Sequence, residues 1–267
     1  MPLQITRAPL ASGSVETWTL NDPASRNALS EAMVDALLAA CERAAADADL
    51  RGVVLRGAGG HFCAGGSLGG FAKTIGQPLA AGASDPLVTL NRRFGTLLQA
   101  LCALPQWFIV AVEGAAMGGG FGLVCCADQV LAHTSAQFAT PEVTLGIVPA
   151  QIAPFVVRRL GPAAARRCLL TGERWDATMA QRAGLVDEVV AGDMEAAVQA
   201  AIARHAAAAP QAVAATKRLL LAQTNTSLPA LLDEAAMAFA QALRGPEAPQ
   251  GLAAFAARKA PPWSANS

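Results

Sequence analysis

Residues 117–122 read MGGGFG, and they directly follow the apolar run WFIVAV (107–112) and a short link. Glycine loses more conformational freedom on folding than any other residue and brings no side chain to a core. Three consecutive glycines after a run that reads as a buried strand therefore need a reason. Close approach of a ligand to the backbone is one such reason. A tight turn is the simpler alternative for any one loop of this kind.

The composition describes a neutral and apolar chain. It has 267 residues, of which 53% are hydrophobic and 15% charged, with 20 basic and 20 acidic side chains. This length allows one large domain, or one domain with a small appendage. The balanced charge argues against nucleic-acid partners and against a basic membrane-binding surface.

Targeting and redox signals are weak. The first twenty residues lack the basic start and apolar core of a secretory signal, and the longest apolar run is too short to span a bilayer. The six cysteines show no CxxC spacing. We therefore expect reduced, structural thiols and a cytoplasmic protein.

Strand-then-helix units recur along the first two thirds of the chain, beginning at residues 53, 108 and 129. This pattern predicts an α/β fold with ligands near the carboxyl ends of strands. We also expect a strand over 15–20 and a helix capped by Ser30.

The last part of the chain differs from the rest. We divide the chain into a core over 1–192, with the site, and a helical region over 193–267. Several helical faces in that region are too apolar to be left in water, so we expect it to serve oligomerisation. The helices that we expect there cover residues 194–209, 211–224, 228–243 and 249–258.

Three other glycine motifs fit poorly. A P-loop would require Lys where Gly120 stands, and the GxGxxG fingerprint would require Gly where Leu123 stands. Residues 65–69 (GGSLG) fit the GxSxG nucleophile elbow, but residues 57–66 before Ser67 read as loop rather than strand. The remaining use of glycine is to expose backbone N–H groups that stabilise an oxyanion. CAGGS (63–67) and MGGGFG each follow a strand and could do so together.

Five ordered segments resemble the enoyl-CoA hydratase/isomerase (crotonase) family. The tail GLAAFAARKAPPW (251–263) also resembles the last helix of this family. The five segments are SRNALS (25–30), HFCAGGSL (61–68), AVEGAAMGGGFGL (111–123), ATPEVTLGIVP (139–149) and LTGERWDATMAQRAGLVDEVV (170–190). The resemblance implies a crotonase-like spiral of ββα units with a C-terminal helical trimerisation region, assembled as a homotrimer or a dimer of trimers. It also implies an acyl-CoA thioester substrate and neither a metal nor a redox cofactor, since CoA is part of the substrate.

The resemblance also assigns site residues. Gly66 and Gly119 take the positions of the two oxyanion N–H groups, and Glu142 takes that of the acid/base glutamate. Ala28, Ala64 and Gly65 fall where the family binds adenine and pantetheine. Arg26 could reach a CoA phosphate or remain a solvated loop residue. The remaining predicted substrate-binding residues are Leu68, Gly118, Gly122 and Pro141.

The sequence departs from the two-glutamate hydratases of the family. The first glutamate of those enzymes falls on Gly122, so this chain resembles the one-glutamate members. A single base suits a double-bond isomerase. However, GIVPAQIAPFVVRRL (146–160) resembles hydratases of branched, glutaconyl-type substrates, in which Gln151 or a substrate carboxylate could position the water. We expect an enoyl-CoA hydratase. The isomerase and a non-catalytic acyl-CoA-binding protein are the alternatives.

Overall fold

The protein is described by a computed structural model that covers residues 1–66, 75–79, 82–223 and 226–264. Six strands form the main sheet, in the order β1-β2-β3-β4-β6-β9. β1 pairs with β2 antiparallel, and the other neighbours are parallel. The strands are β1 (Leu3–Pro9), β2 (Ser14–Leu20), β3 (Leu50–Gly57), β4 (Trp107–Val112), β6 (Gln129–His133) and β9 (Glu188–Val190).

A second sheet holds three short strands in the order β5-β7-β8. They are β5 (Ala115–Met117), β7 (Gln137–Ala139) and β8 (Trp175–Asp176). β5 follows β4 after two residues, so the chain passes from the large sheet into the small one just before the glycines.

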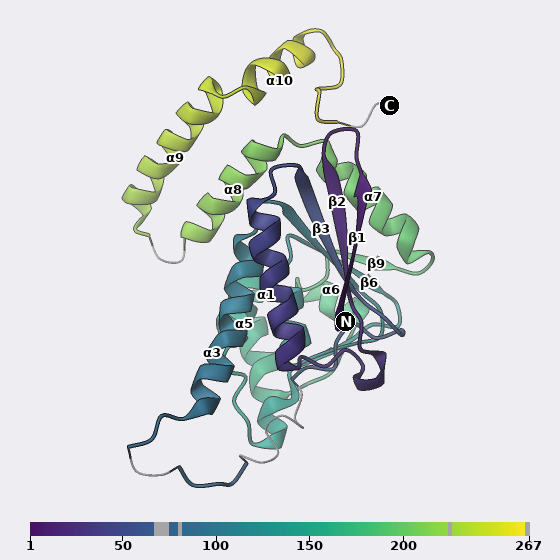
Figure 1. Cartoon of the computed structure of the whole chain (residues 1–267), viewed down its shortest axis with the longest axis vertical. Helices are drawn as coiled ribbons and strands as arrows, with labels where there is room; N and C mark the ends of the chain where they lie inside the picture. The colour runs from purple at the N-terminus through teal and green to yellow at the C-terminus, as the bar shows by residue number, and fades with distance from the viewer. Residues whose placement is uncertain (67–74, 80–81, 224–225, 265–267) are drawn as a thin grey trace.

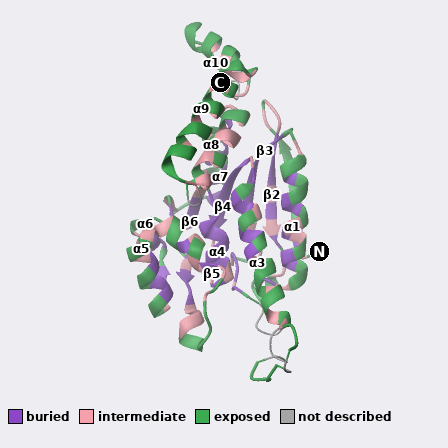
Figure 2. Ribbon diagram, turned by 90° about the vertical axis from the view of Figure 1, so that its left-hand side faces the viewer, coloured by how far each residue is buried: buried purple, intermediate pink, exposed green. Residues whose placement is uncertain are grey.

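Helices cover both faces of the main sheet (Figures 1 and 2). Because side chains alternate along a strand, Val53 and Leu55 of β3 enter one core and Val54 enters the other. The larger core lies against α1, α3, α4 and α5, and the smaller one against α7. These helices are α1 (Glu31–Ala46), α3 (Pro86–Ala103), α4 (Gly119–Cys125), α5 (Ala153–Thr171) and α7 (Met194–Ala206).

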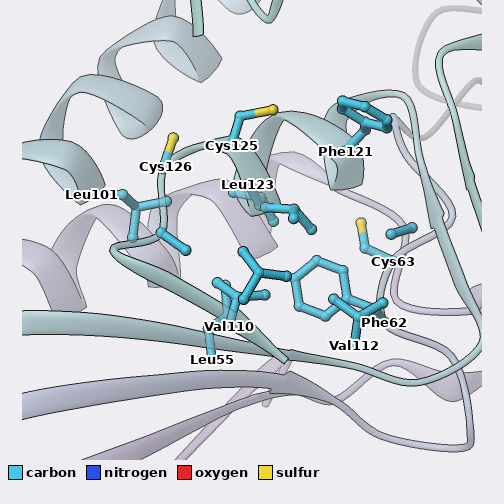
Figure 3. Close-up of a cluster of buried hydrophobic side chains, with 14 of the residues drawn as sticks. Leu55, Phe62, Cys63, Leu101, Val110, Val112, Phe121, Leu123, Cys125 and Cys126 are labelled. Carbon is cyan, nitrogen blue, oxygen red and sulfur yellow. The ribbon is translucent and has the colours of Figure 1, made fainter. Parts of the chain in front are cut away.

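Figure 3 shows the part of the larger core that lies beneath α4, where Leu55, Val110 and Leu123 belong to one buried cluster. α4 therefore packs against apolar side chains of β3 and β4. This packing fixes a short helix whose first residues are glycines, which have poor helix propensity.

The remaining helices are α6 (Ala177–Arg182), α8 (Pro210–Ala222), α9 (Leu228–Arg244) and α10 (Glu247–Ala256). α9 and α10 extend away from the sheet in Figure 1. Their exposed apolar side chains include Leu228, Phe239 and Phe255. No helix in the described ranges is long and apolar enough to cross a membrane.

Several predicted elements match the structure closely. The strand expected over 15–20 is β2, and Ser30 caps α1 by accepting a hydrogen bond from the Met33 N–H at 3.2 Å. α4 begins at Gly119, because Gly118 turns the chain with φ of 50° immediately before it.

Candidate active site

Four backbone segments lie side by side where β4 leads into α4. The Leu29 N–H donates to the Gly65 carbonyl at 2.8 Å, which joins the loop after β2 to the loop after β3. The Cys63 N–H donates to Ala115 at 2.8 Å, and the Met117 N–H donates to Cys63 at 2.9 Å. β5 then pairs with β7. The two predicted glycine loops are therefore neighbours, paired through their own backbones.

Glycine is required where these loops touch. Gly65 has φ of 96°, and a Cβ atom on it would stand 2.8 Å from the Met117 carbonyl oxygen. A Cβ on Gly120 would stand 2.7 Å from the Cys63 oxygen. Both distances are shorter than a side chain allows. These glycines therefore bring the loops together, in addition to any contact with a ligand.

The two predicted oxyanion groups belong to Gly66 and Gly119. Gly119 is the first residue of α4, so its N–H lies among the helix donors that have no intrahelical acceptor. Gly66 ends the described part of the first loop. Within the described ranges we find no hydrogen-bond acceptor for either N–H. Both donors are thus free to meet an oxygen.

Glu142 lies beside the start of α4. It belongs to a 3-10 turn over Pro141–Leu145, which ends at Gly146 with φ of 72°. Thr140 anchors the turn through a 2.9 Å hydrogen bond to the Cys168 carbonyl of α5. A Cβ on Gly118 would be 2.8 Å from Glu142 Oε1, so the carboxylate lies directly over this glycine.

The carboxylate of Glu142 is partly desolvated. Its Oε2 atom is buried and has no hydrogen-bond partner among the described residues. Burial raises the pKa of the Glu142 carboxyl above its ordinary value, because the charged form loses hydration. A carboxyl group with a raised pKa is well suited to exchange protons with a substrate.

Gly122 has no room for a side chain. Ile152 Cβ would be 3.2 Å from a Cβ at this position, and Ile152 Cγ2 would be closer still. Ile152 itself is buried, just before α5. The space that a second carboxylate would need is therefore filled by Ile152, whose role we did not predict from the sequence.

The loop after β2 carries Arg26 and Ala28. Arg26 is exposed with φ of 55°, and its carbonyl accepts a hydrogen bond from the Ala64 N–H at 2.9 Å. The Ala28 carbonyl accepts from the Ser30 N–H at 2.9 Å. Pro141 opens the turn that holds Glu142. These predicted substrate-binding residues thus border the glycine loops, whereas Leu68 lies outside the described residues.

Asn27 holds this loop in place and was missed by the sequence analysis. Its side chain is fully buried, and its amide donates to the carbonyls of Ala58 and His61 at 2.9 and 2.8 Å. Its Oδ1 accepts from the Asp22 N–H at 2.9 Å. The signal was the residue type, since asparagine tolerates the left-handed φ of 59° that this turn requires.

A surface hollow of about 730 Å³ lies elsewhere, on α5 and α6. None of the predicted site residues lines it. We therefore place the candidate active site at the glycine loops, where the Glu142 carboxylate lies over Gly118, the residue before the Gly119 N–H.

Comparison with known proteins identifies the family of this chain. Residues 11–266 match the family model of enoyl-CoA hydratase/isomerase. The 2,3-dehydroadipyl-CoA hydratase of Escherichia coli (strain K12) is 34% identical over 248 residues, which cover 91% of this chain and 92% of that enzyme.

Two solved structures have folds similar to that of this chain. The enoyl-CoA hydratase/isomerase from Marinobacter aquaeolei has a TM-score of 0.91 at 41% identity and covers 98% of each chain. Pseudomonas aeruginosa AtuE has a TM-score of 0.91 at 44% identity, covering 99% of this chain and 100% of its own. The chain therefore belongs to the enoyl-CoA hydratase/isomerase family and has its crotonase fold.

Proposed function

We propose that this protein adds water across the 2,3 double bond of an enoyl-CoA thioester and that Glu142 alone carries out both proton transfers. The relatives named as hydratases support the reaction class. The finer assignment rests on one observation. A single desolvated carboxylate lies over Gly118, next to the free N–H of Gly119.

The reaction follows from these groups. The Glu142 carboxylate takes a proton from water, and the hydroxyl oxygen forms a bond to C3 of the substrate. The electrons of the double bond move onto the thioester oxygen, where the N–H groups of Gly66 and Gly119 stabilise the enolate. The protonated Glu142 then delivers its proton to C2, which regenerates the carboxylate. The raised pKa of Glu142 favours the first step, in which the carboxylate takes up a proton from water.

An enoyl-CoA isomerase is the second candidate. Ile152 fills the space beside Gly122, which leaves one carboxylate, and one base suffices to remove a proton and return it two carbons away. A non-catalytic acyl-CoA-binding protein would also keep the fold. The desolvated Glu142 argues against it, because an unpaired buried oxygen is unfavourable and is commonly retained for chemistry.

We further propose that the substrate carries a branch or a second carboxylate. The Escherichia coli relative is named for a dehydroadipyl thioester, whose acyl chain ends in a carboxylate.

The proposed reaction uses neither a metal nor a redox cofactor, since both proton transfers pass through Glu142. The six cysteines are free, which supports a reducing compartment such as the cytoplasm.

We also propose that copies of the chain assemble as trimers or as dimers of trimers through α9 and α10. Leu228 and Phe239 are each 67% exposed and Phe255 is 84% exposed, although all three are strongly apolar. Burial of such side chains between subunits would be favourable. Light scattering on the purified protein measures this assembly directly.

The test uses three substrates in H₂¹⁸O: crotonyl-CoA, 2,3-dehydroadipyl-CoA and a 3-enoyl-CoA. The variant is Glu142→Gln, and the matched control is Glu113→Gln, which removes a carboxylate that pairs with Arg56 at 3.4 Å instead. We expect heavy oxygen at C3 of the first two products. We expect kcat to fall about 10²–10⁴-fold in Glu142→Gln and to stay near that of the wild type in Glu113→Gln.

The other outcomes would overturn the proposal. A 2-enoyl product formed from the 3-enoyl substrate without uptake of oxygen would make the protein an isomerase. Tight binding of all three thioesters without turnover would make it a binding protein. Unchanged hydration in Glu142→Gln would remove Glu142 from the mechanism.

A further inference from the structure

A second cavity lies away from the glycine loops, at the far end of α4. Its volume is about 310 Å³, and it lies where the ends of α3 and α4 meet α5 and α8. The proposed reaction uses none of the residues around it. The lining consists of Cys102, Cys125, Cys126, Ala127, Asp128, Arg158, Arg159, Lys217, Leu220 and Leu221.

Cys102 meets a cation in this cavity. The Arg158 Nη2 group donates a hydrogen bond to Cys102 Sγ at 2.7 Å. Lys217 adds positive charge nearby, although its ammonium group also donates to the Asp128 carboxylate and to the Gln106 carbonyl, each at 2.6 Å. A thiolate beside a guanidinium group is stabilised in the same way as other reactive cysteines.

A second thiol lies within reach of the first. Cys126 caps the end of α4, and its Sγ approaches the Gly122 carbonyl at 3.3 Å and the Leu98 carbonyl at 3.6 Å. Leu98 lies one turn before Cys102 on α3, and the two cysteines line the same cavity. The cavity therefore holds an ion-paired sulfur on α3 and a second thiol at the end of α4.

The other thiols of the chain behave differently. Cys126 and the Arg158 guanidinium group lower the pKa of Cys102 to about 7, despite its burial. Burial raises the pKa of Cys41 to about 12 and that of Cys168 to about 11. Burial also raises the pKa of Cys126, which keeps that thiol protonated. Near pH 7, about half of Cys102 is thus a thiolate.

We propose that Cys102 and Cys126 form a redox-sensitive dithiol, in which a hydroperoxide oxidises Cys102 and Cys126 then closes a disulfide between α3 and α4. In the first step, the Cys102 thiolate attacks the hydroperoxide. The O–O bond breaks, an S–O bond forms, and the leaving alkoxide or hydroxide takes up a proton. In the second step, Cys126 attacks the sulfenic acid of Cys102, which releases one water molecule.

The position of this dithiol connects it to the candidate active site. α4 begins at Gly119, which carries a predicted oxyanion N–H, and Cys126 follows its last residue. Disulfide formation would draw the Cys126 sulfur away from the Gly122 carbonyl of the same helix. The disulfide would thus join the C-terminal end of α4 to the last turn of α3.

The first experiment maps the disulfide in the intact protein after treatment with hydrogen peroxide. Combined cleavage after Arg93 and Glu113, and after Glu142, separates Cys102 on residues 94–113 from Cys125 and Cys126 on residues 114–142. We expect these two peptides to be cross-linked and to separate on reduction. Cys126→Ala should abolish the cross-link, and Cys125→Ala should keep it.

The second experiment measures how fast iodoacetamide alkylates each cysteine between pH 5 and pH 10. We expect Cys102 to react with a midpoint near pH 7 and ahead of the other thiols. In Arg158→Gln, its rate at pH 7 should fall about tenfold, because loss of the guanidinium group raises the pKa of Cys102 and leaves most of the thiol protonated at that pH. Arg158→Lys keeps a positive charge and should restore most of the rate.

Two results would overturn the proposal. One is peroxide treatment that leaves residues 94–113 and 114–142 separate while Cys102 stays reduced. The other is alkylation of Cys102 no faster than that of Cys41, with no response to Arg158→Gln.

Discussion

Glu142, the proposed acid/base, occupies an unfavourable position. One carboxylate oxygen is buried without a partner, and burial raises the pKa of the group. A folded-state pKa above the unfolded value means that the native protein binds the proton more tightly than the unfolded chain does. The charged carboxylate therefore lowers stability above this raised pKa, and the loss disappears as the pH falls to the ordinary value.

We predict that Glu142→Gln is more stable than the wild type at pH 8, although we expect its kcat to be about 10²–10⁴-fold lower. Glutamine has nearly the same shape and carries no charge to desolvate, so we expect a gain of roughly 1 kcal/mol, or about 2–4 °C in Tm. Thermal unfolding at pH 8 and at pH 4 measures the difference. The gain should vanish at pH 4, where Glu142 is protonated in both the folded and the unfolded state. A Glu142→Gln protein that is less stable at pH 8 would contradict this account.

The residues of the candidate site differ in how far they could be predicted from the sequence. Gly66, Gly119 and Glu142 stand in motifs that resemble a family, so their positions could be predicted without a structure. Ile152 could not, because its contact with Gly122 joins residues thirty positions apart and no motif marks it. Asn27 is intermediate, since its type indicates a turn but not its buried bonds to Ala58 and His61.

At the scale of elements, α4 is held by close contact with its neighbours. Gly122 on α4 lies against Ile152, which precedes α5. Such a contact limits both the side chains and the spacing that the two elements can adopt.

We predict that Gly122→Ala destabilises the protein by about 1–3 kcal/mol, because the added methyl group overlaps Ile152. In an Ile152→Ala background the same change should be nearly neutral, although Ile152→Ala itself is destabilising. Denaturant unfolding of the four proteins in a double-mutant cycle gives this coupling energy. Gly192→Ala is the matched control, since a Cβ on Gly192 meets open space. Equal effects of Gly122→Ala in both backgrounds would show that Ile152 is not the obstacle.

The elements that the sequence analysis missed share a physical cause. β1 alternates apolar and polar residues only over Leu3–Thr6 and buries Leu3 alone, so its signal as a strand is short. The strands β5, β7 and β8 are two or three residues long and are held by backbone pairing, which composition does not encode. The longer strands β3 and β4 bury side chains on both faces and were found from their apolar runs.

At the scale of the whole molecule, Arg51 joins distant parts of the chain. This side chain of β3 is buried, and its guanidinium group donates to the carbonyl groups of Ser12 at 3.0 Å and Ala208 at 2.7 Å. It also reaches Ala206 at 3.3 Å and Trp263 at 3.4 Å. One side chain thus contacts the β1–β2 turn, the end of α7 and the end of the chain.

We predict that Arg51→Met lowers the free energy of unfolding by roughly 2–3 kcal/mol, because several carbonyl groups lose a charged donor. It should also speed hydrogen exchange in α10 more than in α1. Arg56→Met on the same strand is the control, since Arg56 pairs with the partly exposed Glu113 and Glu195 and should change stability by less than 1 kcal/mol. Equal exchange of α10 in both variants would rule out this anchoring role.

The two ends of the C-terminal helical segment therefore meet at one point. Ala208 precedes α8, Trp263 follows α10, and Arg51 contacts both, while the Trp263 indole donates to Ala207 at 3.1 Å. The segment of α8, α9 and α10 is therefore attached to β3 at both of its ends, within a single copy of the chain. Folding of the chain has already ordered this segment. A partner that covers Phe239 and Phe255 would therefore bind without the entropic cost of ordering it. Association should then depend on the hydrogen bonds of Arg51, which hold the two ends of this segment, as much as on the apolar side chains themselves.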